Sequence, residues 1–262
     1  VSVSTLLRAA GATRLADIMD PVTEIPVGMD QEEVAYIFDK YHLISAPVVD
    51  PAGRLVGQIT VDDVVGVIQE ETEEDILALA GVSDAGRDAG ITSILRSRLP
   101  WLVLNLATES VAVTVIQAFQ HEIAQLVTLA VLMPIVSSVG GSAGTQTLAV
   151  AVRALSSREL NASNALRIIL REMWVGMING GALALVMAVA VFGFFHDPRL
   201  SLTIALALVI NLFLAALVGI LVPLTLDRLG RDPAVASGVL ITFVTDLMGF
   251  LSFLGLASLI LL

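Results

Sequence analysis

Five long apolar stretches constrain the fold of this chain more than any other feature of its sequence. Three of them contain no charged residue: 123–152, 173–195 and 200–226. Two more, 99–119 and 233–262, each contain a single acid. About 20 apolar residues span the hydrocarbon core of a bilayer as a helix. We therefore predict an α-helical membrane protein whose five transmembrane helices lie at about 99–119, 123–152, 172–195, 200–226 and 233–262.

The negative charge of the chain is concentrated in its first ninety residues. Residues 1–90 carry 17 acids against five bases, a formal charge of −12, whereas residues 91–262 carry eight acids against nine arginines, or +1. The contrast indicates an acidic soluble module joined to a membrane domain. Such a charge argues against nucleic acid as a partner and suits divalent cations. The sequence contains no cysteine, which excludes disulfides and thiolate metal sites.

Arginines near the ends of the predicted helices indicate an orientation in the membrane. If the acidic module lies in the cytoplasm, eight arginines fall on the inner side and only Arg199 falls on the outer side. This distribution follows the positive-inside rule. We therefore expect a multi-pass protein of the inner (plasma) membrane with a cytoplasmic N-terminal domain and, after five helices, a C-terminus outside.

Asp246 is the single charged residue of the last apolar stretch. An ionised carboxylate is costly at bilayer depth and marks an ion path, a proton relay or a counter-ion. Gly238, Thr242, Asp246 and Gly249 recur at spacings of four, four and three, which places them on one face of a helix. Small neighbours leave room for solvent, and Mg²⁺ usually keeps several waters and binds through one or two carboxylates. A protonated acid bonded to a neighbouring helix is the structural alternative.

Two further features of the apolar stretches leave alternatives open. The run 140–147, Gly-Gly-Ser-Ala-Gly-Thr-Gln-Thr, either lets helices pack closely or lines a water-filled path. Glu109 lies about halfway along the first stretch. It either bonds in its protonated form to a neighbouring helix or faces the water-filled path.

The soluble half alternates helical and strand patterns. The acids within 30–33 precede a helical stretch at 34–41. Short strands are predicted at 46–49 and 55–60, on either side of a Pro-Ala-Gly turn. Thr60 and the two aspartates that follow cap a helix from Val64. The soluble module is therefore expected to be an α/β domain.

The order of these motifs resembles a CBS domain. The resemblance is carried by Ile18-Met19, Val34-Ala35, Ala46-Pro47-Val48-Val49-Asp50, Gly53-Arg54-Leu55-Val56-Gly57 and Ile59-Thr60-Val61-Asp62-Asp63. CBS domains generally work in tandem, and residues 1–12 resemble the tail of a first copy. We therefore expect an N-terminal part upstream of Val1.

The membrane half resembles the MgtE family of magnesium transporters. For the family's second helix, the similarity lies in Leu132-Met133-Pro134-Ile135-Val136, Gly140-Gly141-Ser142-Ala143-Gly144-Thr145-Gln146 and Arg153-Ala154-Leu155. For its fifth helix, it lies in Asp232-Pro233-Ala234 and Thr245-Asp246-Leu247-Met248-Gly249-Phe250. The resemblance divides the chain into a CBS tail (1–12), a CBS domain (13–75), a connecting, plug-like helix (76–98) and a transmembrane domain (99–262).

This resemblance implies a homodimeric Mg²⁺-selective channel whose pore lies on the dimer axis. Asp246 matches the acid that holds a hydrated Mg²⁺ in the pore, and Thr242 and Gly238 match pore-lining positions. The resemblance further implies that the pore closes when cytoplasmic Mg²⁺ binds between the CBS domain and the connecting helix. The candidate regulatory ligands are Glu32, Asp63, Glu71, Glu74 and Asp75. Thr60 and Asp63 also match a CBS motif that contacts the ribose of an adenine nucleotide, which makes ATP a second candidate ligand.

Four positions depart from the family pattern. Ser142 replaces an asparagine, Val239 a proline, Gln120 an acid at the outer end of the first helix, and His42 an aspartate of the CBS helix. They leave the assignment of Asp246 intact. The choice among Mg²⁺, Mn²⁺, Co²⁺ and Ni²⁺ stays open.

Two rival functions are weighed against a channel. An intramembrane zinc protease needs two histidines at i and i+4, and in the run His121-Glu122-Ile123-Ala124-Gln125 the second is replaced by Gln125. An aspartyl protease needs two facing acids, and Asp246 alone lies deep in a helix with a small, polar face. An enzyme is therefore not expected. A carrier that exchanges a divalent cation for Na⁺ or H⁺ remains as the alternative to a channel.

Overall fold

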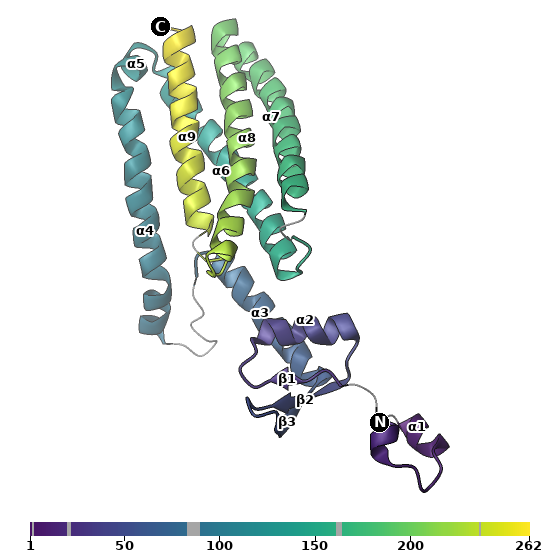
Figure 1. The fold of residues 1–262 in the computed structure, drawn as a ribbon. Coiled ribbons are helices and arrows are strands. Elements are labelled where there is room, and N and C mark those ends of the chain that lie inside the picture. The colour runs from purple at the N-terminus through teal and green to yellow at the C-terminus, as the bar shows by residue number, and fades with distance from the viewer. Residues whose placement is uncertain (2, 20–21, 83–89, 161–163, 236) are drawn as a thin grey trace. The chain divides into compact units, whose positions relative to one another are not determined.

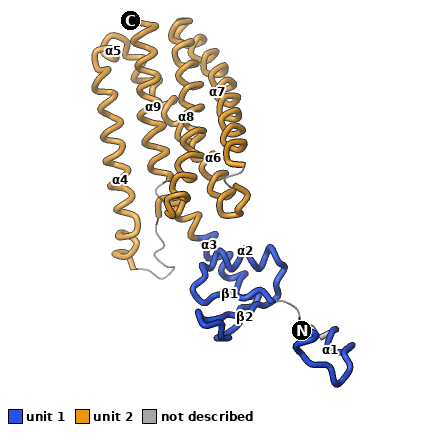
Figure 2. The backbone as a smooth tube through the Cα atoms, viewed as in Figure 1, with its two compact units in different colours: residues 1–73 blue, residues 74–262 orange. Residues whose placement is uncertain are grey.

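The computed structural model describes the chain except for residues 2, 20–21, 83–89, 161–163 and 236. It divides into two compact units, Val1–Glu73 and Glu74–Leu262 (Figure 2). Each unit is described by itself below.

The first unit is a small α/β domain preceded by a short helix (Figure 1). Its elements are α1 (Val3–Arg8), the 3-10 helix η1 (Leu15–Asp17), β1 (Ile25–Pro26), α2 (Gln31–Tyr41), β2 (Ser45–Val49), β3 (Leu55–Thr60) and the larger part of α3 (Val61–Leu79). The sheet order is β1-β2-β3, with β1 parallel and β3 antiparallel to β2. β1 is too short to give a strand pattern, and the sequence did not predict it.

The sheet and helices of this unit enclose one apolar core. Ile25 of β1, Phe38 of α2, Ala46 of β2 and Val64 of α3 are each at most 3% exposed and pack together. Asp30 caps α2 by accepting a hydrogen bond from the backbone N–H of Glu32 at 2.9 Å. The core therefore joins all the regular elements from β1 to α3.

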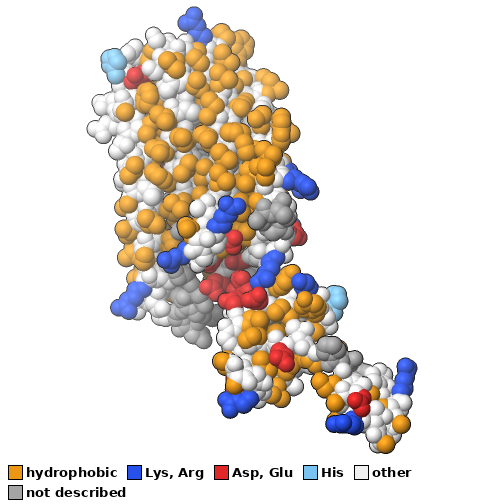
Figure 3. Space-filling model, in the orientation of Figure 1, with side chains coloured by type: hydrophobic (Ala, Val, Ile, Leu, Met, Phe, Trp, Pro, Cys, Tyr) orange, Lys and Arg blue, Asp and Glu red, His pale blue; other side chains and the backbone are white. Residues whose placement is uncertain are grey.

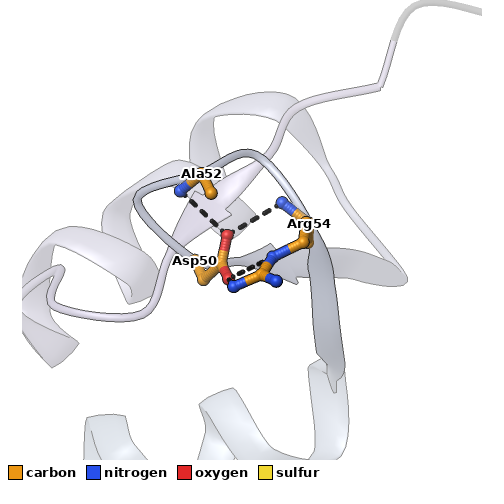
Figure 4. Close-up of polar contacts among 3 residues, drawn as sticks. All are labelled: Asp50, Ala52 and Arg54. Atoms are coloured by element: carbon orange, nitrogen blue, oxygen red, sulfur yellow. Dashed lines mark hydrogen bonds and ion pairs between the residues drawn. The ribbon is translucent and has the colours of Figure 1, made fainter.

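The turn between β2 and β3 is organised by one carboxylate (Figure 4). Asp50 accepts hydrogen bonds from the backbone N–H groups of Ala52 and Arg54, each at 2.9 Å, and pairs with the Arg54 guanidinium at 2.8 Å. Gly53 adopts a φ of +73°, which glycine tolerates without strain. The N–H and then the guanidinium of Arg54 hold the pKa of Asp50 below its ordinary value.

The second unit is a bundle of long helices (Figure 1). After the last residues of α3 come α4 (Ile91–Ala118), the short α5 (Gln120–Gln125), α6 (Thr128–Ser156), α7 (Ala165–Phe195), α8 (Pro198–Arg228) and α9 (Ser237–Ile260). Among the described residues, five helices are long and apolar enough to cross a membrane: α4, α6, α7, α8 and α9. Apolar side chains cover most of the visible face of the bundle (Figure 3). The chain is thus a multi-pass membrane protein.

The bundle is built around α8, which packs against α6, α7 and α9. Its core includes Leu129 of α6, Ile204 and Leu208 of α8 and Phe253 of α9, each with no exposed surface. α4 lies at the side of this group and packs against α9. This arrangement makes α6 and α9 neighbours along their length, with α4 beside α9 (Figure 1).

Several boundaries differ from those expected of the sequence. The segment 76–98, expected as one connecting helix, contains the end of α3 at Leu79 and the start of α4 at Ile91, and its residues 83–89 lie outside the described residues. α4 is therefore longer than the apolar stretch that identified it. The connection between the second and third predicted helices, 153–171, is shorter than expected, because α6 continues to Ser156 and α7 begins at Ala165.

Candidate functional site

A groove of about 570 Å³ runs between α6 and α9. We call it the α6–α9 groove. Its lining combines hydroxyl and small residues and a single acid with three larger apolar residues: Met133, Pro134, Ser137, Ser138, Gly141, Ser142 and Thr145 of α6, and Thr242, Asp246 and Phe250 of α9. Polar groups lining a cavity inside a membrane helix bundle are expected where water or an ion must be accommodated.

Asp246 lies in the wall of this groove and is 9% exposed. The hydroxyl of Ser137, on the facing side of the groove, donates a hydrogen bond to its carboxylate. Ser137 is itself 8% exposed. The carboxylate thus has one fixed donor from α6. Among the described residues, no three His, Asp or Glu side chains gather to hold a metal ion.

Asn211 of α8 holds the α6 backbone beside this contact. It has no exposed surface, and its side-chain N–H donates to the carbonyl of Val136 at 2.8 Å. Val136 directly precedes Ser137. A Cβ on Gly249 would lie 2.9 Å from the Asn211 amide nitrogen, so glycine is required there for α9 to approach. The amide therefore fixes the position from which Ser137 reaches Asp246.

The glycine run of α6, residues 140–147, has two faces. One face packs closely against other helices, and the other lines the groove. Gly140 and Gly144 are buried, and a Cβ at either position would collide with Asn211 or with Ile241. Gly141 and Ser142 line the groove instead. Opposite sides of one run therefore serve close helix packing and the lining of the groove.

A second cavity, of about 250 Å³, continues from the groove toward the end of α3. Thr145 and Thr242 line both cavities. The second cavity is further lined by Gly238 and Val239 of α9, by Trp101, Leu102 and Asn105 of α4, and by Ala78, Leu79, Ala80 and Gly81 at the end of α3. Three of the four residues expected on one face of the last helix, Gly238, Thr242 and Asp246, thus line these two adjoining cavities. The fourth, Gly249, is buried against Asn211.

The end of α3 lies against the second of these cavities. A Cβ on Gly238 would be 3.2 Å from the carbonyl oxygen of Leu79. Ala78 and Leu79 pack against a cluster formed by Leu148 and Val152 of α6 with Ile241 of α9. The last turn of α3 therefore stands beside the second cavity, at the Gly238 end of α9.

Glu109 of α4 lies beside Asp246, with the two carboxyl groups within hydrogen-bonding reach of each other. From the sequence, two environments were considered for Glu109: a contact with a neighbouring helix, or a water-filled path. The structure places it next to the acid of the α6–α9 groove.

Among the described residues of the first unit, no three acids gather into one group that could hold a metal ion. The side chain of Gln31 donates to Glu71, which brings the first turn of α2, with Glu32, to that part of α3. Asp63 lies about two turns of α3 away and accepts hydrogen bonds from the backbone N–H and the hydroxyl of Thr60, at 2.9 and 2.8 Å. The N–H and then the hydroxyl hold the pKa of the exposed Asp63 below its ordinary value.

The contact between Thr60 and Asp63 is a helix cap. Asp63 is the third residue of α3, and its carboxylate bonds back to the N–H of the residue that precedes the helix, as in a capping box. This accounts for both residues without a ligand. A nucleotide at this position stays a prediction from the resemblance alone.

The remaining regulatory candidates belong to the second unit. Asp75 accepts a hydrogen bond from the hydroxyl of Ser156, the last residue of α6, at 3.1 Å. Glu74 is exposed on α3. Asp75, one of the candidate regulatory ligands, is therefore bonded to the end of a helix that lines the groove.

Ser137 and Asn211 are two functional candidates that the sequence analysis missed. Ser137 is one hydroxyl among many in α6, and Asn211 is an isolated amide in an apolar helix. A signal was present for Asn211, because a polar amide at bilayer depth requires a partner. The sequence carried no sign of which partner that was.

Comparison with protein families gives two matches within this chain. Residues 133–256 match the MgtE divalent cation transporter domain, and residues 15–70 match the CBS domain. The first match contains α6 to α9 in nearly their full length, including Ser137, Asn211 and Asp246.

Three magnesium transporters named MgtE are similar over most of the chain. The protein of Thermus thermophilus is 36% identical over 265 residues, covering 100% of this chain and 59% of the relative. Those of Enterococcus faecalis and Bacillus subtilis are each 35% identical, covering 98% and 87% of this chain and 57% and 51% of the relatives. The chain thus spans somewhat more than half the length of these relatives. It belongs to the MgtE family, with a CBS domain followed by the family's transporter domain in a multi-pass membrane protein.

Proposed function

We propose that the protein conducts Mg²⁺ across the inner membrane along the α6–α9 groove, with Asp246 as the acid that holds the hydrated ion. The observation that carries the proposal is the buried position of Asp246 in a groove of about 570 Å³ that is lined in part by hydroxyl groups, within a bundle of helices long enough to span a membrane. The high cost of dehydrating Mg²⁺ favours a single carboxylate acting through water over a cage of protein ligands. The names of the three relatives support Mg²⁺ as the transported ion.

We further propose that two copies of the chain pair across this groove. Ser138, Ser142 and Thr145 line it and are exposed in the single chain. Polar groups facing lipid are unfavourable, whereas a second copy would enclose them in a water-filled path. A twofold axis along the groove would bring two Asp246 carboxylates to one ion.

The N-terminal unit belongs in the cytoplasm and the C-terminus outside in this proposal. The support is the distribution of arginine, with eight residues on the side of the acidic module and Arg199 alone on the other. Membrane-impermeant labelling of a cysteine placed after Leu262 in intact cells tests it. If the cysteine is labelled only after the cells are opened, the C-terminus lies inside and the proposed orientation is wrong.

Cytoplasmic Mg²⁺ is proposed to close the pathway through the end of α3. Leu79 stands beside Gly238, and Asp75 bonds to Ser156 at the end of α6. Glu32, Asp63, Glu71, Glu74 and Asp75 supply carboxylates for Mg²⁺ in the acidic region. Neutralising these charges with Mg²⁺ would remove their mutual repulsion and favour the position of α3 in which Leu79 stands next to the pathway.

Flux in liposomes distinguishes a channel from a coupled carrier. Mg²⁺ uptake into liposomes containing the purified protein is measured with and without a Na⁺ or pH gradient. Uptake that needs neither gradient supports the channel. Strict dependence on one of them would establish the carrier.

The decisive variants are Asp246→Ala and Asp246→Asn, tested in the same liposomes and in a strain that requires external Mg²⁺. Both remove the charge, so Mg²⁺ uptake and growth at low Mg²⁺ should be lost. Asp227→Asn makes the same chemical change at an exposed position near the end of α8 and serves as the control. Normal uptake by both Asp246 variants, at normal protein levels, would refute the proposed pathway.

A further inference from the structure

Glu109 is a second acid at bilayer depth, and it projects from the face of α4 that packs on α9. Ala112, one turn further along α4, has no exposed surface. α4 and α9 are in contact along this face (Figure 1). The carboxyl of Glu109 lies within hydrogen-bonding reach of Asp246. Two acids from different helices therefore meet at one level of the bundle.

The apolar parts of these helices contain no Lys or Arg that could offset the pair. The sequence contains neither Lys nor Arg from 99 to 152, which includes the apolar part of α4 and nearly all of α6, and none from 232 to the end, which includes α9. Two carboxylates so close repel each other strongly in a medium of low dielectric constant. Both carboxyl groups can therefore be ionised together only where a cation lies beside them.

The α6–α9 groove offers the space for such a cation. Asp246 lines a groove of about 570 Å³, and Ser137 bonds to its carboxylate from the other side. Glu109 approaches the same carboxylate from α4. Glu109 is not among the residues that line the groove, but a hydrated divalent ion held there by Asp246 lies close enough to Glu109 to be attracted by its charge and bridged to it by water.

We infer that Glu109 is a second ion-binding acid of the Asp246 site, which raises the affinity for a hydrated divalent cation and the preference for it over monovalent cations. This rests on the proposed Mg²⁺ pathway. A divalent ion gains about twice as much as a monovalent ion from each added carboxylate, since the Coulomb energy is proportional to the charge. Removing Glu109 should therefore weaken Mg²⁺ binding more than Na⁺ binding.

The test compares Glu109→Gln, Glu109→Asp and Asp246→Asn in liposomes. The measured quantities are the half-saturating Mg²⁺ concentration and the ratio of Mg²⁺ to Na⁺ flux. Glu109→Gln keeps the size of the side chain and should raise the half-saturating concentration about three- to tenfold and lower the flux ratio by a similar factor. Glu109→Asp keeps the charge and should recover part of both. Glu172→Gln, the same change in α7, is the matched control.

A purely structural role for Glu109 gives a different result. If the residue only joins α4 to α9, Glu109→Gln would lower the thermal stability of the detergent-solubilised protein while half-saturation and flux ratio stay at their original values. That outcome overturns the inference. It leaves the proposed pathway intact as long as Asp246→Asn abolishes Mg²⁺ flux, whereas normal flux through Asp246→Asn would refute the pathway itself.

Discussion

The hydroxyl of Ser137 donates a hydrogen bond to the carboxylate of Asp246, across the groove between α6 and α9. The two residues are 109 positions apart in the chain. This contact fixes one oxygen of the buried acid and directs the carboxylate relative to the groove. The position of the carboxylate in the groove is therefore set by both helices together.

Replacing Ser137 by alanine removes this donor while leaving the charge of Asp246 in place. A hydrogen bond to a charged group contributes about 1.5–3 kcal/mol, so the carboxylate should become less well positioned. We expect a half-saturating Mg²⁺ concentration a few-fold higher in liposome uptake, with transport retained. Ser252→Ala is the control, because the Ser252 hydroxyl bonds to a carbonyl of its own helix, that of Gly249. Equal effects of the two changes would argue against a role for the Ser137 contact.

Gly219→Ala tests the close approach of α8 to α6. A Cβ at this position would lie 2.8 Å from the carbonyl oxygen of Gly144 and 2.8 Å from the Cβ of Thr147. Neither atom can move away without a shift of the α6 backbone, so the change should cost about 1–3 kcal/mol through overpacking. Thermal unfolding in detergent measures the loss.

Gly181→Ala provides the matched control for that change, because a Cβ there would have no neighbour within 4 Å. Alanine favours the helix relative to glycine by up to about 1 kcal/mol, so this variant should unfold at the same temperature as the parent or slightly above it. A loss at position 181 as large as that at 219 would contradict the packing argument.

Ser156→Ala tests the proposed closure by cytoplasmic Mg²⁺ and should weaken it. The Ser156 hydroxyl donates to Asp75 at 3.1 Å and joins the last part of α3 to the end of α6. Without it, the position of α3 beside the pathway is less favoured. We expect a higher internal Mg²⁺ concentration to be needed to stop uptake, with the uptake rate at low internal Mg²⁺ unchanged.

The neighbouring residue supplies the control for closure. The Ser157 hydroxyl bonds to the carbonyl of Arg153 within α6, so Ser157→Ala should close at the same internal Mg²⁺ concentration as the parent. If both variants close at the same internal Mg²⁺ concentration as the parent, the contact between Ser156 and Asp75 has no role in closure.

Asp63→Ala should destabilise the protein in a pH-dependent way. The N–H and hydroxyl of Thr60 hold the pKa of Asp63 below its ordinary value in the folded state. The contribution of this carboxylate to stability is therefore complete above the unfolded-state pKa and is lost as the pH falls through the lowered, folded-state pKa. Thermal unfolding at a series of pH values should show parent and variant differing at neutral pH and converging in acid.

Thr60→Val separates the two donors of this cap. The change removes the hydroxyl, which bonds to Asp63 at 2.8 Å, and keeps the backbone N–H, which bonds at 2.9 Å. The difference from the parent at neutral pH should be smaller than for Asp63→Ala. A difference that persists unchanged in acid would show that the effect is not due to the Asp63 charge.

The sequence predicted the membrane helices well because the signal for them is local. A run such as 200–226, with no charge in 27 residues, has few structures open to it other than a spanning helix. The alternation of strand and turn residues around Asp50 was equally local, and β2 and β3 lie within one residue of their expected positions. β1 was missed because two residues paired to a distant strand carry no pattern of their own.

The face of α9 that bears Gly238, Thr242 and Asp246 also followed from spacing alone, since helical periodicity puts these residues in line. The residues that pack against that face could not be predicted from the sequence. Helices that are apolar all round give no indication of which side meets which neighbour. Ser137, Asn211 and Glu109 therefore could not be assigned to the same site from their positions in the chain.

The sequence by itself determined that this protein has five spanning helices, an acidic α/β module and a carboxylate at bilayer depth, because length, charge and periodicity act within single elements. Only the tertiary structure decided the rotation of each helix about its axis. That rotation brings Ser137 and Glu109 to Asp246, buries Gly140 and Gly144 against their neighbours and leaves Gly141 in the groove. The physical reason is that helix rotation is fixed by side-chain packing between distant segments, which no local pattern encodes.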